Sequence, residues 1–388
     1  MNILICNVGS TSLKYQLFAM EQGEKVLKKG GAERVGQEKS LFYVTDPITG
    51  QKVQNEAHFP SHLEAIVAML EAIQPEKADC VAFKVVHAKG VTGTQYLTDE
   101  VLSAMEAFNA VAPAHNPPYL AAIRLFRQAM PGVPLIGAFE TAFHANMPPE
   151  ASLYSIPAGL SKTHEIRRYG FHGASHEYLS SFAMEKLVKE NSKIITCHLG
   201  GSASICAVKD GVSVDTSLGL SLQCGIMHNN RCGDIDPYII FYLAEECGMS
   251  LSEIKTMLQT KSGFLGMSGL SGDLRDVEEA AKLGNEDCAV AISSYAYSIR
   301  KYLGAYAAAM GGVDAVVFGG GIGTNSATIR RMALKDLEFL GICLDQEKNG
   351  KALEEISKDG SPVRIYLVET NEEIIVARKA KALLLESK

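Results

Sequence analysis

The sequence predicts an α/β protein built from two similar halves. In residues 194–217 an apolar run leads through a Gly200-Gly201-Ser202 turn into a second apolar run, which ends at an Asp210-Gly211 turn. This pattern predicts three strands joined by tight turns. Residues 3–18 repeat it, with Ile3 at the position of Ile194, 191 residues earlier in a chain of 388. Glycine and small hydroxyl residues let a turn approach phosphate, so we expect a duplicated fold that holds nucleotide phosphates between its halves. Taken alone, either turn also fits a plain hairpin.

Length and charge limit the function classes. A chain of 388 residues is too long for one compact core and predicts two domains. A net charge of −7 and the absence of Trp argue against a nucleic-acid binder and against attraction to an anionic membrane. The N-terminus lacks the pattern of a signal peptide, and no apolar run reaches the roughly 20 residues that span a bilayer. We therefore expect a cytoplasmic protein that binds neither nucleic acid nor membrane.

Apolar spacing and cap residues predict the other elements in order. The first half continues with a strand at 25–35, a polar and turn-rich stretch at 41–60, and strands at 81–87 and 134–139. Its helices are expected at 61–74, capped by Ser61, at 98–110, capped by Thr98, and at 119–130. Residues 145–165 cross to the second half, with helices expected at 173–191, 237–248, 250–260, 286–310 and 371–386 and a buried strand at 313–318.

A glycine-rich stretch, Gly319 to Gly323, directly follows the strand expected at 313–318. It allows close approach of a ligand to the backbone, and the helix expected to begin near Ser326 would favour an anion. It is not a Walker loop, because no Lys-Ser or Lys-Thr follows, and Thr324 stands where G-x-G-x-x-G needs its third glycine. A nucleotide loop and a tight strand-to-helix turn both remain open.

Eight motifs along the chain resemble those of one family. They read NVGSTSLKYQLF, FETAFH, RRYGFHGASH, TCHLGGSAS, DTSLGLSLQCGIMHNNRCGDIDP, GLSGDLRD, GGGIGTNSATIRR and ETNEEIIVAR. In this order they resemble the acetate kinases, members of the superfamily of acetate and sugar kinases, Hsc70 and actin. The resemblance covers essentially the whole chain. It implies a duplicated actin-like (ribonuclease H-like) two-domain α/β fold, with mixed sheets flanked by helices and the active site in the cleft between the domains. The expected domains are 1–148 with 375–388, and the nucleotide-binding part 149–374.

The resemblance also implies a reaction and its residues. It implies reversible transfer of a phosphoryl group between ATP and a short carboxylic acid such as acetate, with Mg²⁺ or Mn²⁺, in a homodimer. The residues implied in catalysis are Glu140, His172, Arg231 and His115, and those implied in carboxylate binding are Lys84, Val86, Ala114, Phe171 and Leu222. Those implied in nucleotide binding are Lys14, His198, Leu199, Gly200, Gly201, Ser202, Asp273, Leu274, Arg275, Gly321, Ile322, Gly323, Thr324 and Asn325. Asn7 and Glu372 are implied near the metal ion, largely through waters.

Several of these positions depart from the pattern of the acetate kinases. Lys84 replaces an arginine and Glu140 an aspartate, so that both charges are kept while their geometry changes. Gly201-Ser202 stands in place of Asn-Gly, and 228–230 reads His-Asn-Asn in place of Met-Gly-Thr. The remaining departures are Leu222 for a proline, Ala114 for a leucine and Thr324 for a glutamate.

These departures leave other functions open beside an acetate kinase. Ala114 would widen the acyl pocket for a larger acid such as propionate or butyrate. The changes at Gly201-Ser202 and Thr324 leave open pyrophosphate or another phosphoryl donor in place of ATP. A nucleotide-binding regulatory protein with little turnover is the alternative outside enzymology.

Overall fold

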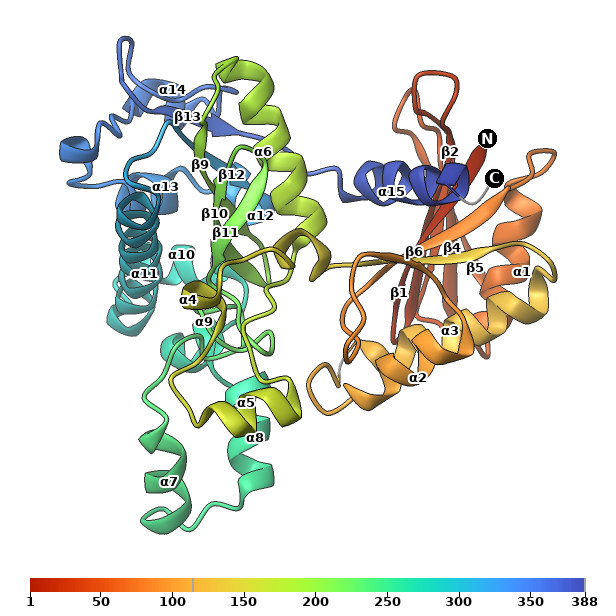
Figure 1. The fold of residues 1–388 in the computed structure, drawn as a ribbon, viewed down its shortest axis with the longest axis horizontal. Helices are drawn as coiled ribbons and strands as arrows, with labels where there is room; N and C mark the ends of the chain where they lie inside the picture. Colours follow the sequence, from red (N-terminus) through yellow and green to blue (C-terminus); the bar gives the residue numbers. More distant parts are fainter. Residues whose placement is uncertain (114, 387–388) are drawn as a thin grey trace. The chain divides into compact units, whose positions relative to one another are not determined.

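The chain forms two compact units, which the computed structural model describes over residues 1–113 and 115–386 (Figure 1). Unit 1 consists of Met1–Ala145 and Asn371–Lys388, and unit 2 of Asn146–Thr370. The changes of unit fall after Ala145 and after Thr370, so Glu372 belongs to unit 1.

Unit 1 contains an eight-stranded mixed sheet in the order β5-β4-β3-β2-β1-β6-β8-β7. Helices α1 and α3 pack against it, and α15 packs against β1, β6 and β8. The strands are β1 (Asn2–Gly9), β2 (Ser12–Ala19), β3 (Lys25–Glu33), β4 (Ser40–Thr45), β5 (Lys52–Ala57), β6 (Cys80–Val85), β7 (Thr94–Tyr96) and β8 (Leu135–Phe139). The helices are α1 (His62–Ala72), α2 (Asp99–Ala107), α3 (Asn116–Ala129) and α15 (Glu372–Glu386).

Unit 2 contains a five-stranded sheet in the order β11-β10-β9-β12-β13, with α6 and α11 on opposite faces (Figure 1). The strands are β9 (Lys193–Leu199), β10 (Ala203–Lys209), β11 (Val212–Thr216), β12 (Ala315–Gly319) and β13 (Arg364–Leu367). The helices are α4 (Pro149–Ser152), α5 (Ala158–His164), α6 (Gly173–Leu187), α7 (Tyr238–Glu245), α8 (Leu251–Thr260), α9 (Gly263–Ser268), α10 (Leu274–Lys282), α11 (Glu286–Met310), α12 (Gly320–Asn325), α13 (Ala327–Ala333) and α14 (Gln346–Gly350).

The two sheets share one topology. In unit 1, β3, β2 and β1 are antiparallel neighbours, and β1, β6 and β8 then run parallel. In unit 2, β11, β10 and β9 are antiparallel neighbours, and β9, β12 and β13 then run parallel. The repeat between residues 3–18 and 194–217 therefore marks equivalent hairpins, and the predicted duplication is confirmed.

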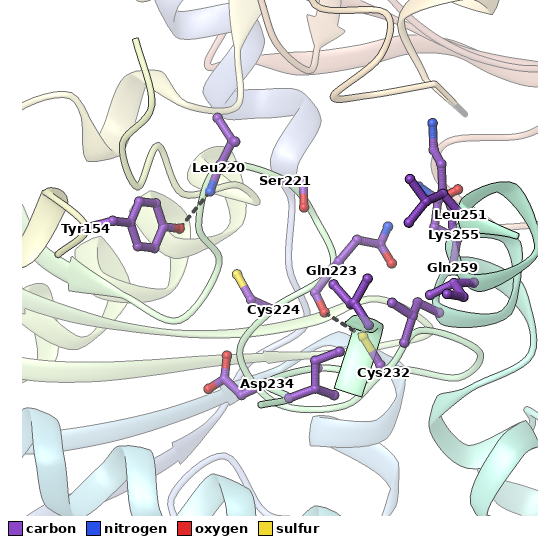
Figure 2. Close-up of a pocket in the computed structure, with 15 residues that line it drawn as sticks. Tyr154, Leu220, Ser221, Gln223, Cys224, Cys232, Asp234, Leu251, Lys255 and Gln259 are labelled. Carbon is purple, nitrogen blue, oxygen red and sulfur yellow. Dashed lines mark hydrogen bonds between the residues drawn. The ribbon is translucent and has the colours of Figure 1, made fainter. Parts of the chain in front are cut away.

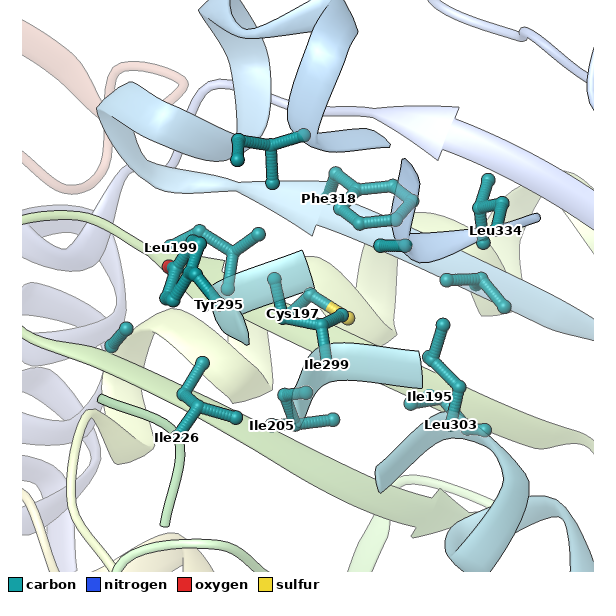
Figure 3. Packing of buried hydrophobic residues seen from close by; sticks show 14 of the residues in the cluster. Ile195, Cys197, Leu199, Ile205, Ile226, Tyr295, Ile299, Leu303, Phe318 and Leu334 are labelled. Atoms are coloured by element: carbon teal, nitrogen blue, oxygen red, sulfur yellow. The ribbon is translucent and has the colours of Figure 1, made fainter. Parts of the chain in front are cut away.

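The core of unit 2 lies between its sheet and α11 (Figure 3). Ile195, Cys197 and Ile205 of the sheet meet Tyr295 and Ile299 of the helix, and all five side chains are fully buried. Complete burial of one such aliphatic side chain stabilises a fold by about 1.5–3 kcal/mol. This packing gives the β9–β10 turn a rigid support.

The observed helix starts agree well with those predicted from the sequence. The predictions for polar and glycine-rich stretches agree less well with the structure. Ser61 and Thr98 cap α1 and α2 as predicted. The stretch 41–60 holds the β4–β5 hairpin, which we did not expect. The expectation that a helix begins near Ser326 is incomplete, because the short helix α12 already begins at Gly320 and α13 follows Ser326.

Candidate active site

In unit 1, polar side chains lie where three neighbouring parallel strands end. Asn7 lies near the end of β1, Lys84 near the end of β6, and Glu140 directly after β8. Val85 of β6 is paired with Phe139 of β8, which brings Lys84 and Glu140 to the same edge. The carboxyl edge of parallel strands is where α/β proteins commonly bind ligands.

Lys84 is held between two carboxylates. Its Nζ lies 3.1 Å from Glu140 Oε1 and forms a second, closer ion pair with Glu372 at the start of α15. Burial lowers the pKa of Lys84, but the charges of Glu372 and Glu140 outweigh burial and raise that pKa well above its ordinary value. Lys84 is therefore a fixed cation at any working pH.

Asn7 and Glu372 offer oxygen atoms to a metal ion. Asn7 Oδ1 accepts a hydrogen bond of 2.8 Å from the Tyr119 hydroxyl. Within residues 1–113 and 115–386, no three His, Cys, Asp or Glu side chains form a group that could hold a metal ion by themselves. An amide and a carboxylate oxygen in one unit nevertheless fit an ion such as Mg²⁺, which keeps several waters and takes one or two protein ligands.

The other predicted residues of unit 1 lie near this edge or outside the description. Val86 follows β6 and is buried, and His115 directly precedes α3. Lys14 is exposed and lies opposite Asn7 in the β1–β2 hairpin. Lys14 belongs to unit 1, whereas the other predicted nucleotide residues belong to unit 2. Ala114 lies outside the described residues.

In unit 2, His172 directly precedes α6 in a strained conformation. Its φ of 58° lies in the left-handed region, which residues with a side chain seldom adopt. Strain of this kind clusters at functional sites. The His172 ring stacks on His198, with 4.3 Å between the ring centroids, and the neighbouring Phe171 is fully buried.

A chain of hydrogen bonds leads from His172 into the interior of unit 2. Ser204 Oγ lies 2.8 Å from His172 Nδ1 and 2.7 Å from His176 Nε2, and Thr196 Oγ1 lies 2.7 Å from His176 Nδ1. In the described part of the chain, this is the only hydrogen bond of the buried Thr196 hydroxyl. Thr196 therefore donates to His176, His176 to Ser204, and Ser204 to His172. This order leaves the proton of a neutral His172 on Nε2.

Arg231 lies in the loop between β11 and α7. Its guanidinium donates to Ser202 Oγ at 3.0 Å, and the same nitrogen lies 3.5 Å from the carbonyl oxygen of Leu222. Burial lowers the pKa of Arg231, but an arginine pKa starts so high that the side chain stays charged. Unit 2 thus holds a cation beside the β9–β10 turn.

Segments distant in sequence line one pocket of about 480 Å³ in unit 2. They are the β9–β10 turn, the start of α10 and helix α12. Gly320 has a φ of 75°, and a Cβ there would lie 2.6 Å from the Leu199 carbonyl oxygen, so only glycine lets α12 approach β9 this closely. The predicted residues in the lining are Gly200, Gly201, Asp273, Leu274, Arg275, Gly321, Ile322 and Asn325.

Other residues of this pocket differ from the prediction. His198, Leu199, Ser202, Gly323 and Thr324 are not part of the lining, although they lie on the same segments. Asn229, Glu278 and Ser326 do line it and were not predicted as ligands. Ser326 donates to Glu278 at 2.6 Å and caps α13, so its signal in the sequence was that of a helix start. Glu278 lies within α10 and carries no motif.

Arg330 holds the far end of α12 from inside the protein. Its side chain is fully buried and donates to the carbonyl oxygens of Gly323 at 2.8 Å and Thr324 at 2.9 Å. It also donates to the side chain of Asn349 at 2.7 Å and to its carbonyl oxygen at 3.0 Å. These bonds satisfy carbonyl groups at the end of the short helix that lines the pocket.

A second pocket, of about 440 Å³, lies beside the Arg231 loop (Figure 2). Apolar residues of α8 and of the segments 220–224 and 232–235 line most of it. Figure 2 shows Cys224 and Cys232 on its wall, with the Cys232 thiol 3.7 Å from the Gln223 carbonyl oxygen. We did not predict this pocket from the sequence, although two of its wall segments, 220–224 and 232–235, fall within the motif DTSLGLSLQCGIMHNNRCGDIDP.

Comparison with known proteins agrees with this arrangement. Residues 2–378 match the acetokinase family. The chain belongs to this family. It is similar to the acetate kinase of Natranaerobius thermophilus, with 43% identity over 399 residues that cover 99% of this chain and 100% of the relative. The resemblance seen in the eight motifs is thereby confirmed.

Solved structures of acetokinase relatives have the same fold. The acetate kinase of Porphyromonas gingivalis superimposes with a TM-score of 0.89 at 38% identity, over 99% of each chain. A propionate kinase from Francisella tularensis gives a TM-score of 0.90 at 33% identity, over 97% of this chain and 98% of that one. The predicted actin-like two-domain fold is confirmed. As a member of the acetokinase family, this protein is a phosphotransferase that acts on a carboxyl group of a small molecule, and the family uses ATP with a divalent metal ion.

Within the described residues, no helix is both long enough and apolar enough to cross a membrane.

Proposed function

We propose that this protein transfers a phosphoryl group reversibly between ATP and acetate, which yields acetyl phosphate, with Mg²⁺ as the metal ion. The observation that carries the proposal is the pocket of about 480 Å³, which segments 200–201, 229, 273–278 and 321–326 line together. Its size suits a nucleotide, and the helix N-terminus at Asp273 and backbone amides of the glycine-rich turn suit phosphate.

The charged residues that bind the acid in this proposal belong to unit 1. Lys84 donates a hydrogen bond to the acid's carboxylate, and Glu140, 3.1 Å from Lys84, orients the acid together with it. Val86 and Ala114 of unit 1 are proposed to contact the acyl group, together with Phe171 and Leu222 of unit 2. A carboxylate oxygen of the acid attacks the γ-phosphorus, and the bond from that phosphorus to the leaving ADP oxygen breaks.

Unit 2 supplies charge stabilisation. Phosphoryl transfer depends on positioning and on donors around the three equatorial oxygens. Arg231 offers a planar, permanently charged donor, and a neutral His172 offers its Nε2–H. His115 is proposed as a further donor on the family resemblance.

Asn7 and Glu372 would hold hydrated Mg²⁺. When bound, the ion neutralises charge on the phosphate oxygens. Glu372 is also paired with Lys84. We therefore expect the positive charge of Lys84 to weaken the attraction between Glu372 and the metal ion. Cytoplasmic location and a homodimer are proposed from the family resemblance.

The phosphoryl donor and the acid are tested in one assay. Acetate, propionate and butyrate are each combined with ATP, GTP and pyrophosphate in the presence of Mg²⁺, and the acyl phosphate is trapped as a hydroxamate. We expect acetate with ATP to lead. Propionate stays the second candidate, because one similar structure is that of a propionate kinase. If no mixture yields acyl phosphate while ATP still raises the melting temperature of the protein, a regulatory nucleotide binder would be favoured.

Arg231→Ala tests the assigned role of the arginine. We expect kcat to fall by roughly 10²–10³-fold, the usual loss when one preorganised donor to a transition state is removed. The dissociation constant of ATP should change far less. An unchanged kcat would contradict the role given to Arg231.

A further inference from the structure

We propose that Ser202 and His228 are positioning residues that hold the Arg231 guanidinium in place for phosphoryl transfer. The proposal rests on the function proposed above and deepens it. The three side chains belong to unit 2. Ser202 lies in the β9–β10 turn, and His228 and Arg231 lie 26 and 29 residues later, in the loop before α7. Neither Ser202 nor His228 needs to touch the substrate for this role.

The direction of every hydrogen bond in this chain is fixed by chemistry. The backbone N–H of Ala203 donates to His228 Nδ1 at 2.9 Å, and a backbone N–H can only donate. His228 Nδ1 therefore carries a lone pair. Because Nδ1 carries no hydrogen, the Ser202 hydroxyl, 3.2 Å away, can only donate to it, and the two donors share its one lone pair. Arg231 can only donate, so the Ser202 oxygen accepts its N–H at 3.0 Å.

The environment of His228 keeps its ring neutral, so that the hydrogen bonds to Nδ1 keep their direction. Its side chain is 1% exposed. Burial, together with the positive charge of Arg231, lowers the pKa of His228 to about 3. The ring is therefore neutral at any working pH, and Nδ1 stays an acceptor. A hydroxyl held at both ends loses its rotational freedom, so the guanidinium finds its acceptor already oriented.

A further contact joins the same two segments of unit 2. The β9–β10 turn and the Arg231 loop are also joined by the backbone N–H of Asn229, which donates to the Gly201 carbonyl at 3.0 Å. Gly201, Ser202, His228 and Asn229 are all positions where the chain departs from the acetate kinase pattern described above. The residues at these positions contact one another. We therefore infer that the four replacements together form one hydrogen-bonded arrangement rather than four independent changes.

Steady-state kinetics of single variants test the proposal. We expect Ser202→Ala to lower kcat by about tenfold, which corresponds to one hydrogen bond of about 1.4 kcal/mol, with less than about a twofold change in the KM for ATP. Ser202→Thr keeps the hydroxyl and should restore most of kcat. His228→Leu should lower kcat as Ser202→Ala does, whereas His228→Asn keeps an acceptor near Nδ1 and should lose less.

Ser221→Ala is the matched control. Ser221 lies in the segment that carries Leu222, is partly buried like Ser202, and forms no hydrogen bond with Arg231 among the described residues. We expect it to keep normal kcat. Melting temperatures of all variants separate loss of folding from loss of positioning.

A double-substitution cycle with Arg231 decides how Ser202 acts. If Ser202 works only through Arg231, Ser202→Ala should cause little further loss in the Arg231→Ala background. An equal loss in both backgrounds, or a normal kcat for Ser202→Ala in the folded enzyme, would overturn the proposal. A wild-type enzyme without phosphoryl transfer would instead refute the proposed function, so the two failures are distinguishable.

Discussion

At the scale of single residues, the hydrogen-bond chain behind His172 leads to a kinetic prediction. Ser204→Ala removes the donor that keeps the proton of His172 on Nε2, so a share of the rings would present a lone pair to the phosphoryl group instead. We expect kcat to fall by about three- to tenfold, and Ser204→Thr to retain more activity.

¹⁵N NMR of histidine side chains checks the same prediction without activity. In the wild type we expect the His172 resonances, assigned by their loss in His172→Gln, to report a protonated Nε2 and an unprotonated Nδ1. A protonated Nδ1 at pH 7 would contradict the direction that we assign to the chain.

The buried His228 predicts a pH dependence of stability. Its pKa of about 3 in the folded state lies below the ordinary value of about 6.5 expected in the unfolded chain. Between these values the unfolded state binds a proton that the folded state does not, so stability falls as pH falls from about 6.5 towards 3. The slope is about 1.4 kcal/mol per pH unit.

Urea denaturation of the wild type and of His228→Asn at pH 7 and pH 5 measures this effect. We expect the wild type to lose about 2 kcal/mol more between the two pH values than the variant does. Parallel losses would show that His228 is not the group responsible.

Which residues meet was only partly predictable from the sequence. Lys84 and Glu140 could be placed near each other, because Lys84 lies near the end of one apolar strand and Glu140 directly follows another. The contact of Ser202 with His228 could not, because it depends on how a loop folds back on a turn 26 residues away. Glu278 reaches the pocket only through the placement of α10 beside α12.

At the scale of elements, α12 depends on Arg330. Arg330→Lys keeps the charge but loses most of the donors to Gly323, Thr324 and Asn349. Because α12 lines the proposed nucleotide pocket, we expect the KM for ATP to rise by about tenfold, while kcat and the KM for the acid change little.

Arg331→Lys is the control for this prediction. Arg331 is the next residue of α13 and is exposed, so its change should leave all three constants within about twofold. An equal effect of both variants, or no effect of Arg330→Lys, would contradict the role of Arg330.

Elements were predictable where capping and periodicity agree. Ser61, Thr98 and Ser250 begin helices as expected, and each accepts a backbone hydrogen bond at its helix N-terminus. β5 has exposed side chains at all but its last residue, so it shows no alternation of buried and exposed positions. α12 opens with two glycines, which disfavour a helix, so helix propensity did not predict it.

At the scale of the whole molecule, unit 1 is completed by the last helix of the chain. Ile375 of α15 is 3% exposed, and the helix packs against β1, β6 and β8. We expect Ile375→Ala to lower the free energy of unfolding by about 2–5 kcal/mol, because a cavity would be left in the core of unit 1. Chemical denaturation followed by circular dichroism measures the loss.

Leu385→Ala is the control on the same helix. Leu385 is 52% exposed, and we expect its loss to change stability by less than about 0.5 kcal/mol. Similar effects of the two substitutions would mean that α15 does not contribute to the core of unit 1.

The return of α15 also sets the order in which a ribosome can finish the two units. Unit 2 is one continuous segment and can fold as soon as Thr370 has emerged. The first 145 residues must wait for the helix that begins at Glu372, while about 225 residues of unit 2 are synthesised. At 5–20 residues per second this delay lasts roughly 10–45 s. During that time the apolar surface that α15 later covers stays open to chaperones, so the half synthesised first is the half completed last.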